Sequence, residues 1–377
     1  NENQYNGGLV TNGVGKFAHI NDAALTSLRD MGTTHIWLTG VLQQATATDY
    51  PNIGQPADDP DVLKGKAGSF FAIKDYFDVS PDYALDPANR LEEFEALVDR
   101  VHAHDMKVII DFVPNHVART YASDIRPEQS FGADDDTSKF YDPQNNFFYL
   151  NDPPGQSLSL PAPDHWDRPP GADGTIEQED NDGTPPGDVP RVTGNNQATA
   201  SPSVNDWYET VKLNYGYDFT TGTENYEPIP DTWKKMDAVL AYWQEMGVDG
   251  FRCDFAHLVP LEAWRWLIDK ARERDPDVYF FAEAYLTGQA VPGFSFSSMV
   301  QAGFDAVYDD ASYDTVKGIV CCGKWANDLE EQLPGDFMFD KSLRYAENHD
   351  ERRIASPLVE GSNPDDSGFG SMQAGKP

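Results

Sequence analysis

Short apolar runs that alternate with amphipathic segments restrict the fold of this 377-residue chain more than any other feature. Nearly continuous apolar runs between segments of helical periodicity are typical of parallel strands that are buried on both faces. The expected helices are Asp22–Met31, Arg90–His104, Asp231–Met246 and Leu261–Arg274. The expected strands are His35–Thr39, Lys107–Phe112, Gly250–Asp254, Val278–Glu283, Phe304–Tyr308 and Ser342–Glu347. This pattern favours a closed α/β barrel or a large doubly wound sheet.

Residues 118–219 interrupt the alternation. They show little helical periodicity and are rich in Pro, Gly, Asp and Asn. A structureless loop of this length is unusual inside a compact domain, so we predict an irregular inserted subdomain. The chain then divides into a first part of the barrel at residues 1–117, the insert at 118–219, and a second part of the barrel at 220–377.

The charge balance is strongly acidic, with 63 Asp and Glu residues against 28 Lys and Arg residues and a net charge of -35. Such a surface repels nucleic acid and anionic membranes, so we expect neither as a partner. No apolar run reaches the roughly 18 residues that a membrane span needs. The first residues, Asn1–Gln4, lack the basic head and apolar stretch of a signal peptide, and we expect a cytoplasmic location.

Chemically active side chains follow the expected strands. Arg252 and Asp254 are two positions apart on one strand, so both face the lumen of a barrel while Cys253 faces the helices. A neighbouring guanidinium keeps a carboxylate ionised, as a covalent nucleophile requires. Glu283 follows an apolar run, where partial burial would raise its pKa toward that of a general acid. Each residue alone has a structural explanation as a helix cap or ion-pair partner, but several such strand ends in order favour a catalytic site.

Four segments together resemble the signature regions of the α-amylase superfamily, glycoside hydrolase family 13, and they occur in that family's order. The segments are Asp111–His116, Gly250–His257, Glu283 in its Phe-Ala-Glu-Ala setting, and Glu347–Asp350. The resemblance implies a (β/α)8 TIM barrel in which the insert is the family's B domain. It also implies an incomplete barrel with two open sheet edges, because relatives carry a first strand and an eighth strand that this sequence lacks. We expect residues 1–377 alone to fold poorly, since open sheet edges expose unpaired backbone groups.

The resemblance assigns roles to single residues. It implies that Asp254 is the nucleophile, that Glu283 is the acid/base, and that Asp350 is a third carboxylate that holds sugar hydroxyls. The implied substrate contacts are Arg252, His116, His349, Phe71, His257 and Arg353. At Phe71 most relatives carry a Tyr, so stacking on the sugar is kept but the hydroxyl is lost.

Asn115 matches a position that binds calcium in many relatives through its side-chain oxygen. The other calcium ligands cannot be matched to this sequence, although Asp218 is one candidate. Calcium is therefore the one metal ion that the resemblance suggests. We expect that the activity requires no cofactor.

The implied activity is that of a retaining glycoside hydrolase. It would act on α-1,4-glucosidic bonds of starch-like glucans or malto-oligosaccharides through a covalent glycosyl-enzyme intermediate. In such enzymes the two carboxyl groups lie about 5 Å apart. The alternative is an α-glucanotransferase or sugar isomerase of the same family. A catalytically inactive binding protein is disfavoured, because Asp254, Glu283 and Asp350 are all present.

The acidity leads to a first prediction. Two explanations stay open, namely a protein adapted to high salt and an ordinary acidic enzyme. In the first case the free energy of unfolding should rise with NaCl concentration, because salt screens the repulsion among like charges. Thermal unfolding across a salt series measures this, and a melting temperature that does not respond to salt rules out adaptation to high salt.

Overall fold

A six-stranded parallel sheet forms the centre of the protein in the computed structural model, which describes residues 14–65, 67–160, 189–203, 205–285, 290–321, 323–331 and 340–351. The strand order is β1-β4-β9-β10-β11-β12, and every neighbouring pair is parallel. The strands are β1 (His35–Leu38), β4 (Lys107–Phe112), β9 (Gly250–Cys253), β10 (Tyr279–Ala282), β11 (Ala306–Tyr308) and β12 (Ser342–Leu343). All six expected strands are therefore confirmed, and the sheet is that of an incomplete (β/α)8 barrel.

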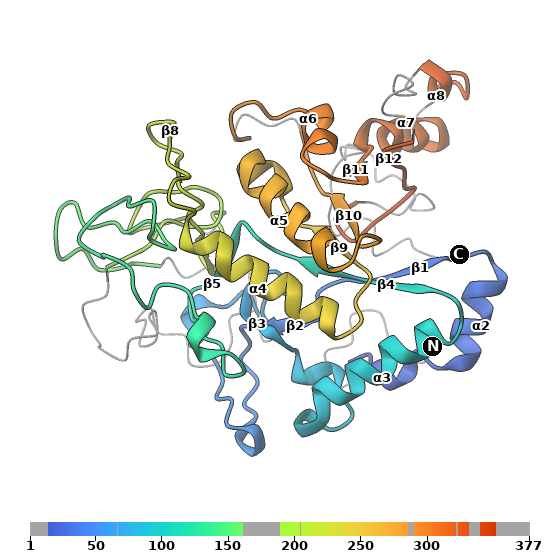
Figure 1. The fold of residues 1–377 in the computed structure, drawn as a ribbon, viewed down its shortest axis with the longest axis horizontal. Helices are drawn as coiled ribbons and strands as arrows, with labels where there is room; N and C mark the ends of the chain where they lie inside the picture. The colour runs from blue at the N-terminus through green and yellow to red at the C-terminus, as the bar shows by residue number, and fades with distance from the viewer. Residues whose placement is uncertain are drawn as a thin grey trace.

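Helices cover the outer face of this sheet, and Figure 1 shows α3, α4 and α5 lying across it. The four expected helices are confirmed, with ends that differ by at most two residues. The helices are α2 (Asp22–Asp30), α3 (Arg90–His102), α4 (Asp231–Glu245), α5 (Leu261–Arg274), α6 (Phe296–Gln301), α7 (Asp310–Cys321) and α8 (Asp328–Glu331). In α4 the buried Trp233, Met236, Val239 and Trp243 recur every three or four positions, so they form one apolar stripe against the sheet. None of these helices is long and apolar enough to cross a membrane.

The insert is tied to the barrel by a short antiparallel pair. β5 (His116–Ala118) follows β4 and pairs with β6 (Thr210–Lys212), so that His116 lies opposite Lys212. The remaining small pairs are β2 (Leu42–Gln44) with β3 (Ile73–Val79), and β7 (Tyr217–Asp218) with β8 (Thr223–Glu224). In Figure 1 the chain of the insert, drawn in green, lies to one side of the sheet. The proposed domain limits themselves stay a prediction.

Alternate residues of the strands face two different apolar clusters. Cys253 and Phe251 pack with the main core beneath the helices. On the lumen side, Ile109, Phe281, Ala306 and Tyr308 form a second cluster, with Trp37 packed against it. Arg252 lies between Phe251 and Cys253 and therefore points toward this lumen cluster, where its guanidinium lies 5.4 Å from the Trp37 ring.

Candidate active site

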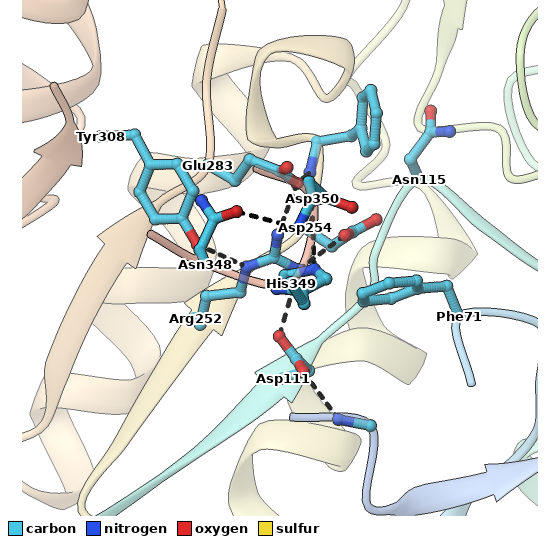
Figure 2. A network of polar contacts seen from close by, with 12 residues as sticks. Phe71, Asp111, Asn115, Arg252, Asp254, Glu283, Tyr308, Asn348, His349 and Asp350 are labelled. Carbon is cyan, nitrogen blue, oxygen red and sulfur yellow. Dashed lines mark hydrogen bonds and ion pairs between the residues drawn. The ribbon is translucent and has the colours of Figure 1, made fainter. Parts of the chain in front are cut away.

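One buried guanidinium gathers three carboxyl groups at the ends of neighbouring strands. Nη1 of Arg252 lies 3.1 Å from Oδ1 of Asp111 and 2.7 Å from Oδ1 of Asp254. Nη2 lies 2.9 Å from Oε2 of Glu283, as an ion pair outside good hydrogen-bond alignment. Figure 2 shows this network, with Arg252 in its middle. Residues from three parts of the sequence thus meet at one point.

The register of the sheet explains why these groups meet. Asp111 on β4 is paired with Arg252 on β9, and Cys253 on β9 is paired with Ala282 on β10. The next residue along each strand is then Asp254 or Glu283, so the two carboxyl groups leave adjacent strands side by side. Carboxyl ends of parallel strands share one edge of the barrel, which is where its chemistry is placed.

A sharp backbone bend at Phe255 connects the two acids. Its φ of 43° and ψ of 42° are left-handed, which is uncommon for a residue other than glycine. In this conformation the Phe255 N–H donates a hydrogen bond of 2.9 Å to Oε2 of Glu283. The hydroxyl of Tyr285 donates to the other oxygen, Oε1, over 3.2 Å. Both oxygens of Glu283 are therefore fixed.

Burial and charge work in opposite directions on the ionisation of this cluster. Burial raises the pKa of Asp254 well above its ordinary value, the negative charge of Glu283 adds to this, and Arg252 opposes it. Burial likewise raises the pKa of Asp111, again against Arg252. For Arg252 burial alone would lower the pKa, but Glu283, Asp254 and Asp111 outweigh it and the pKa rises. The guanidinium therefore stays charged.

The two oxygens of Asp254 have different surroundings. Oδ1 accepts the 2.7 Å hydrogen bond from Arg252, whereas Oδ2 has no hydrogen-bond partner among the described residues. A buried carboxylate oxygen without a donor keeps its lone pairs free for another group. Asp254 thus has one oxygen held by Arg252 and one without an aligned donor in the described part of the chain, and its carboxyl group lies close to that of Glu283.

Three further predicted residues gather beside this network. The His349 ring lies 5.5 Å from the Phe71 ring, and the Arg252 guanidinium lies 5.5 Å from Phe71. Nε2 of His349 lies 3.1 Å from Oδ2 of Asp350, whose side chain is 48% exposed. Burial works to raise the pKa of Asp350, but His349 and Arg252 lower it overall. Asp350 is therefore the exposed acid of the group, since Asp254 and Glu283 are only 2% and 1% exposed.

The two other predicted histidines are buried and held neutral. Burial lowers the pKa of His116 to about 3 and that of His257 to about 4. His116 contacts the Asn115 side chain at 3.1 Å and lies 5.2 Å from the Trp207 ring of the insert. His257 is 1% exposed and packs among aromatic rings, so its role as a sugar contact stays a prediction. Arg353 lies outside the described residues.

Asn115 contacts the buried side chain of Lys212. Its Oδ1 accepts a 2.7 Å hydrogen bond from Nζ of Lys212, and its Nδ2 donates to the carbonyl of Gly194 at 2.8 Å. Burial lowers the pKa of Lys212 to about 7, and Nζ can donate this hydrogen bond in either protonation state. In the part of the chain that the structure describes, no cluster of three or more His, Cys, Asp or Glu residues could hold a metal ion. A calcium ion at Asn115 would compete with the Lys212 side chain for the same oxygen and would lack carboxylate ligands. The surroundings of Asn115 therefore do not fit calcium.

Sequence reasoning left several residues of the network without a role. Asp111 is expected only as part of a signature segment, and the sequence indicates no role for Tyr285 or Tyr308. Tyr308 ends β11, and its hydroxyl accepts a hydrogen bond of 3.3 Å from Nε of Arg252. The strand-end rule that found Asp254 and Glu283 could have found Tyr308, because it holds the same position on the next strand.

The model of the alpha amylase catalytic domain matches residues 10–289. The chain belongs to the alpha-amylase family. Among solved structures, it is similar to an alpha-amylase from Lactobacillus plantarum, with 25% identity, a TM-score of 0.56, and coverage of 92% of this chain and 62% of that one. Alpha-amylase MalA of Haloarcula japonica is 24% identical over 341 residues, which cover 87% of this chain and 35% of MalA.

A third relative is named as a transferase and not as an amylase. The alpha-1,4-glucan:maltose-1-phosphate maltosyltransferase of Pseudomonas aeruginosa is 41% identical over 59 residues, or 16% of this chain and 9% of that enzyme. This chain therefore spans less than two thirds of each of these three relatives.

The Lys212–Asn115 contact makes a prediction about metal dependence. Treatment with EDTA should leave the melting temperature unchanged, because Nζ of Lys212 is the partner of the Asn115 oxygen. Lys212→Met should lower the free energy of unfolding by about 1–3 kcal/mol, since a buried oxygen loses its donor. Lys139→Met is the control, because Lys139 pairs with Asp136 and Asp142 at the surface, where solvent screens the charges, so its loss should change the stability less. A melting temperature that falls on chelation and recovers with calcium would contradict this prediction.

Proposed function

We propose that the protein is a retaining glycoside hydrolase that acts on α-1,4-glucosidic bonds of starch-like glucans or malto-oligosaccharides. Membership of the alpha-amylase family supports a carbohydrate-active enzyme. The observation that carries the proposal is the single guanidinium of Arg252 that contacts both Asp254 and Glu283 at adjacent strand ends. Two carboxyl groups that share one guanidinium fit the short spacing of about 5–5.5 Å in retaining enzymes better than the roughly 6.5–9.5 Å of inverting ones.

In the proposed reaction Asp254 is the nucleophile. Arg252 fixes its Oδ1, which leaves Oδ2 without a protein partner among the described residues and free to attack the anomeric carbon. The bond from that carbon to the leaving oxygen breaks while Glu283 donates its proton to the oxygen. Glu283 then takes a proton from water, and the water opens the glycosyl ester with retention of configuration.

The charges around Arg252 favour this division of roles. Three buried carboxyl groups face one guanidinium, so the cluster retains a proton more readily than isolated carboxyls do. Arg252 makes an aligned hydrogen bond to Asp254 but only an ion pair to Glu283, which favours negative charge on Asp254. The negative charge of Glu283 raises the pKa of Asp254, and a proton carried by Glu283 for the leaving oxygen removes this contribution.

The other predicted residues act as substrate contacts in this proposal. Asp350, the exposed carboxylate, would hold sugar hydroxyls together with His349, which lies beside it. Phe71 would offer its ring as the stacking surface, and His116, which burial keeps as a neutral imidazole, would be a further substrate contact. We assign no calcium ion to the reaction, because Lys212 occupies the side-chain oxygen of Asn115.

Transfer to a sugar is the second candidate, since a glucanotransferase or isomerase forms the same covalent intermediate. The short match to a maltosyltransferase supports keeping it. The two reactions differ in whether water or a sugar hydroxyl releases the intermediate.

Incubation with maltotriose separates hydrolysis from transfer. A hydrolase should yield glucose and maltose, with the new reducing end formed first as the α-anomer, because two displacements restore the configuration. Proton NMR and chromatography follow both products over time. Oligosaccharides longer than maltotriose would instead identify a transferase, and an initial β-anomer would rule out the retaining mechanism.

Asp254→Asn tests the nucleophile. The amide is neutral and a poor nucleophile, so kcat should fall by about 10⁴-fold or more, while maltotriose binding persists. Assays of starch hydrolysis and isothermal titration calorimetry measure the two effects. Asp237→Asn is the matched control on α4, where the carboxylate only pairs with Arg274, and its activity should equal that of the wild type. Substantial turnover by Asp254→Asn would remove Asp254 from this role.

A further inference from the structure

Tyr308 supplies the fourth polar contact of Arg252, on the side away from the carboxyl groups. Nε of Arg252 donates to its hydroxyl at 3.3 Å, and the Tyr308 ring centre lies 5.8 Å from the guanidinium. The terminal nitrogens of the same group face Asp111, Asp254 and Glu283. Figure 2 shows Tyr308 and Asp111 on different sides of Arg252. The guanidinium is therefore held from both ends.

The contact at Nε restricts the orientation of the whole planar group. A guanidinium carries five N–H donors in a fixed fork, so a hydrogen bond at Nε determines where Nη1 and Nη2 point. Arg252 is fully buried, and a buried Nε without an acceptor would carry the cost of an unsatisfied donor. Tyr308 meets that need without adding charge, because burial raises its pKa and keeps the hydroxyl protonated.

Tyr308 is itself held rigidly. Its ring stacks on Phe281 with centres 6.2 Å apart and planes inclined by 21°, and it lies 5.3 Å from the Tyr345 ring. The residue is 3% exposed and is paired with Leu343 of β12. The position of its hydroxyl is thus fixed by the lumen cluster and by the sheet.

We propose that Tyr308 is a positioning residue, whose hydroxyl keeps the two terminal nitrogens of Arg252 divided between Asp254 and Glu283. This inference rests on the proposed glycosidase function of the same site. Without the hydroxyl, the guanidinium is free to turn further toward Asp111, and the hydrogen bond that stabilises the charged form of Asp254 is weakened. Tyr308 acts through Arg252 and needs no contact with the sugar.

The pH dependence of the rate reports on this effect. The charged and titratable groups that face Arg252 are Asp111 from β4, Asp254 after β9, Glu283 after β10, Tyr308 from β11, and the His349–Asp350 pair. Arg252 lowers the pKa of Asp254, so a less well placed guanidinium lets that pKa rise. The acid limb of the pH profile of kcat/KM should then move to higher pH.

Tyr308→Phe compared with Tyr345→Phe tests the proposal. Tyr345 belongs to the same aromatic group, but its hydroxyl donates to Asp310 at 3.0 Å. Loss of the Tyr308 hydroxyl should lower kcat roughly tenfold, with KM changed less than about twofold, because ground-state binding is untouched. The acid limb should shift upward in Tyr308→Phe only. Wild-type kinetics for Tyr308→Phe, or equal losses in both variants, would overturn the proposal.

A second measurement does not depend on turnover. In protein labelled with ¹⁵N-arginine, the Nε–H signal of Arg252 should move in Tyr308→Phe and stay in place in Tyr345→Phe, with the signal assigned by its absence in Arg252→Lys. An unmoved signal in Tyr308→Phe would refute the contact even if no glucan were hydrolysed. Conversely, the signal could move in Tyr308→Phe while the wild-type protein shows no activity on glucans. This result would reject the proposed function but leave the Tyr308–Arg252 contact in place.

Discussion

The burial of one guanidinium among three carboxyl groups is the interaction on which the rest of the site depends. Taking a charged group out of water costs on the order of several kcal/mol per ion, and only close partners offset that cost. Arg252 has such partners from β4, β9 and β10, so its ion pairs also join neighbouring strands across the barrel lumen. The same contacts that offset the burial of the charge set the ionisation of the acids. Stability and chemistry are therefore coupled at this residue.

The register and packing of the strands account for most of this arrangement. Parallel register places Asp254 and Glu283 on adjacent strand ends, and the apolar lumen cluster below them excludes water. The insert contributes through β6, where Lys212 reaches Asn115 at the end of β4. Two distant parts of the chain thus meet at the barrel mouth, where Nζ of Lys212 is the hydrogen-bond donor to Asn115.

Hydrophobic periodicity predicted those strands and helices that bury an apolar face, because burial of such a face is what produces the periodic pattern. The strands of the main sheet and helices α2 to α5 carry long apolar stripes, and their positions could be predicted to within a few residues. Short elements such as α6 and α8 carry too few turns for a period to appear. The Lys212–Asn115 contact spans 97 residues, and no local pattern encodes it. Tyr308 had a positional signal, yet an aromatic residue at a strand end is indistinguishable from ordinary core without knowledge of the Arg252 side chain.

The left-handed bend at Phe255 has a consequence for how this barrel tolerates change. The amide that holds Glu283 is presented by a single pair of torsion angles, immediately after Asp254. Glycine or asparagine adopts such angles at low cost, whereas a β-branched side chain resists them. Loop grafting or insertion at this corner would therefore disturb the hydrogen bond to Glu283, and with it the placement of the two acids, without replacing either acid. A residue without a reactive group thus limits how this corner of the barrel can be redesigned.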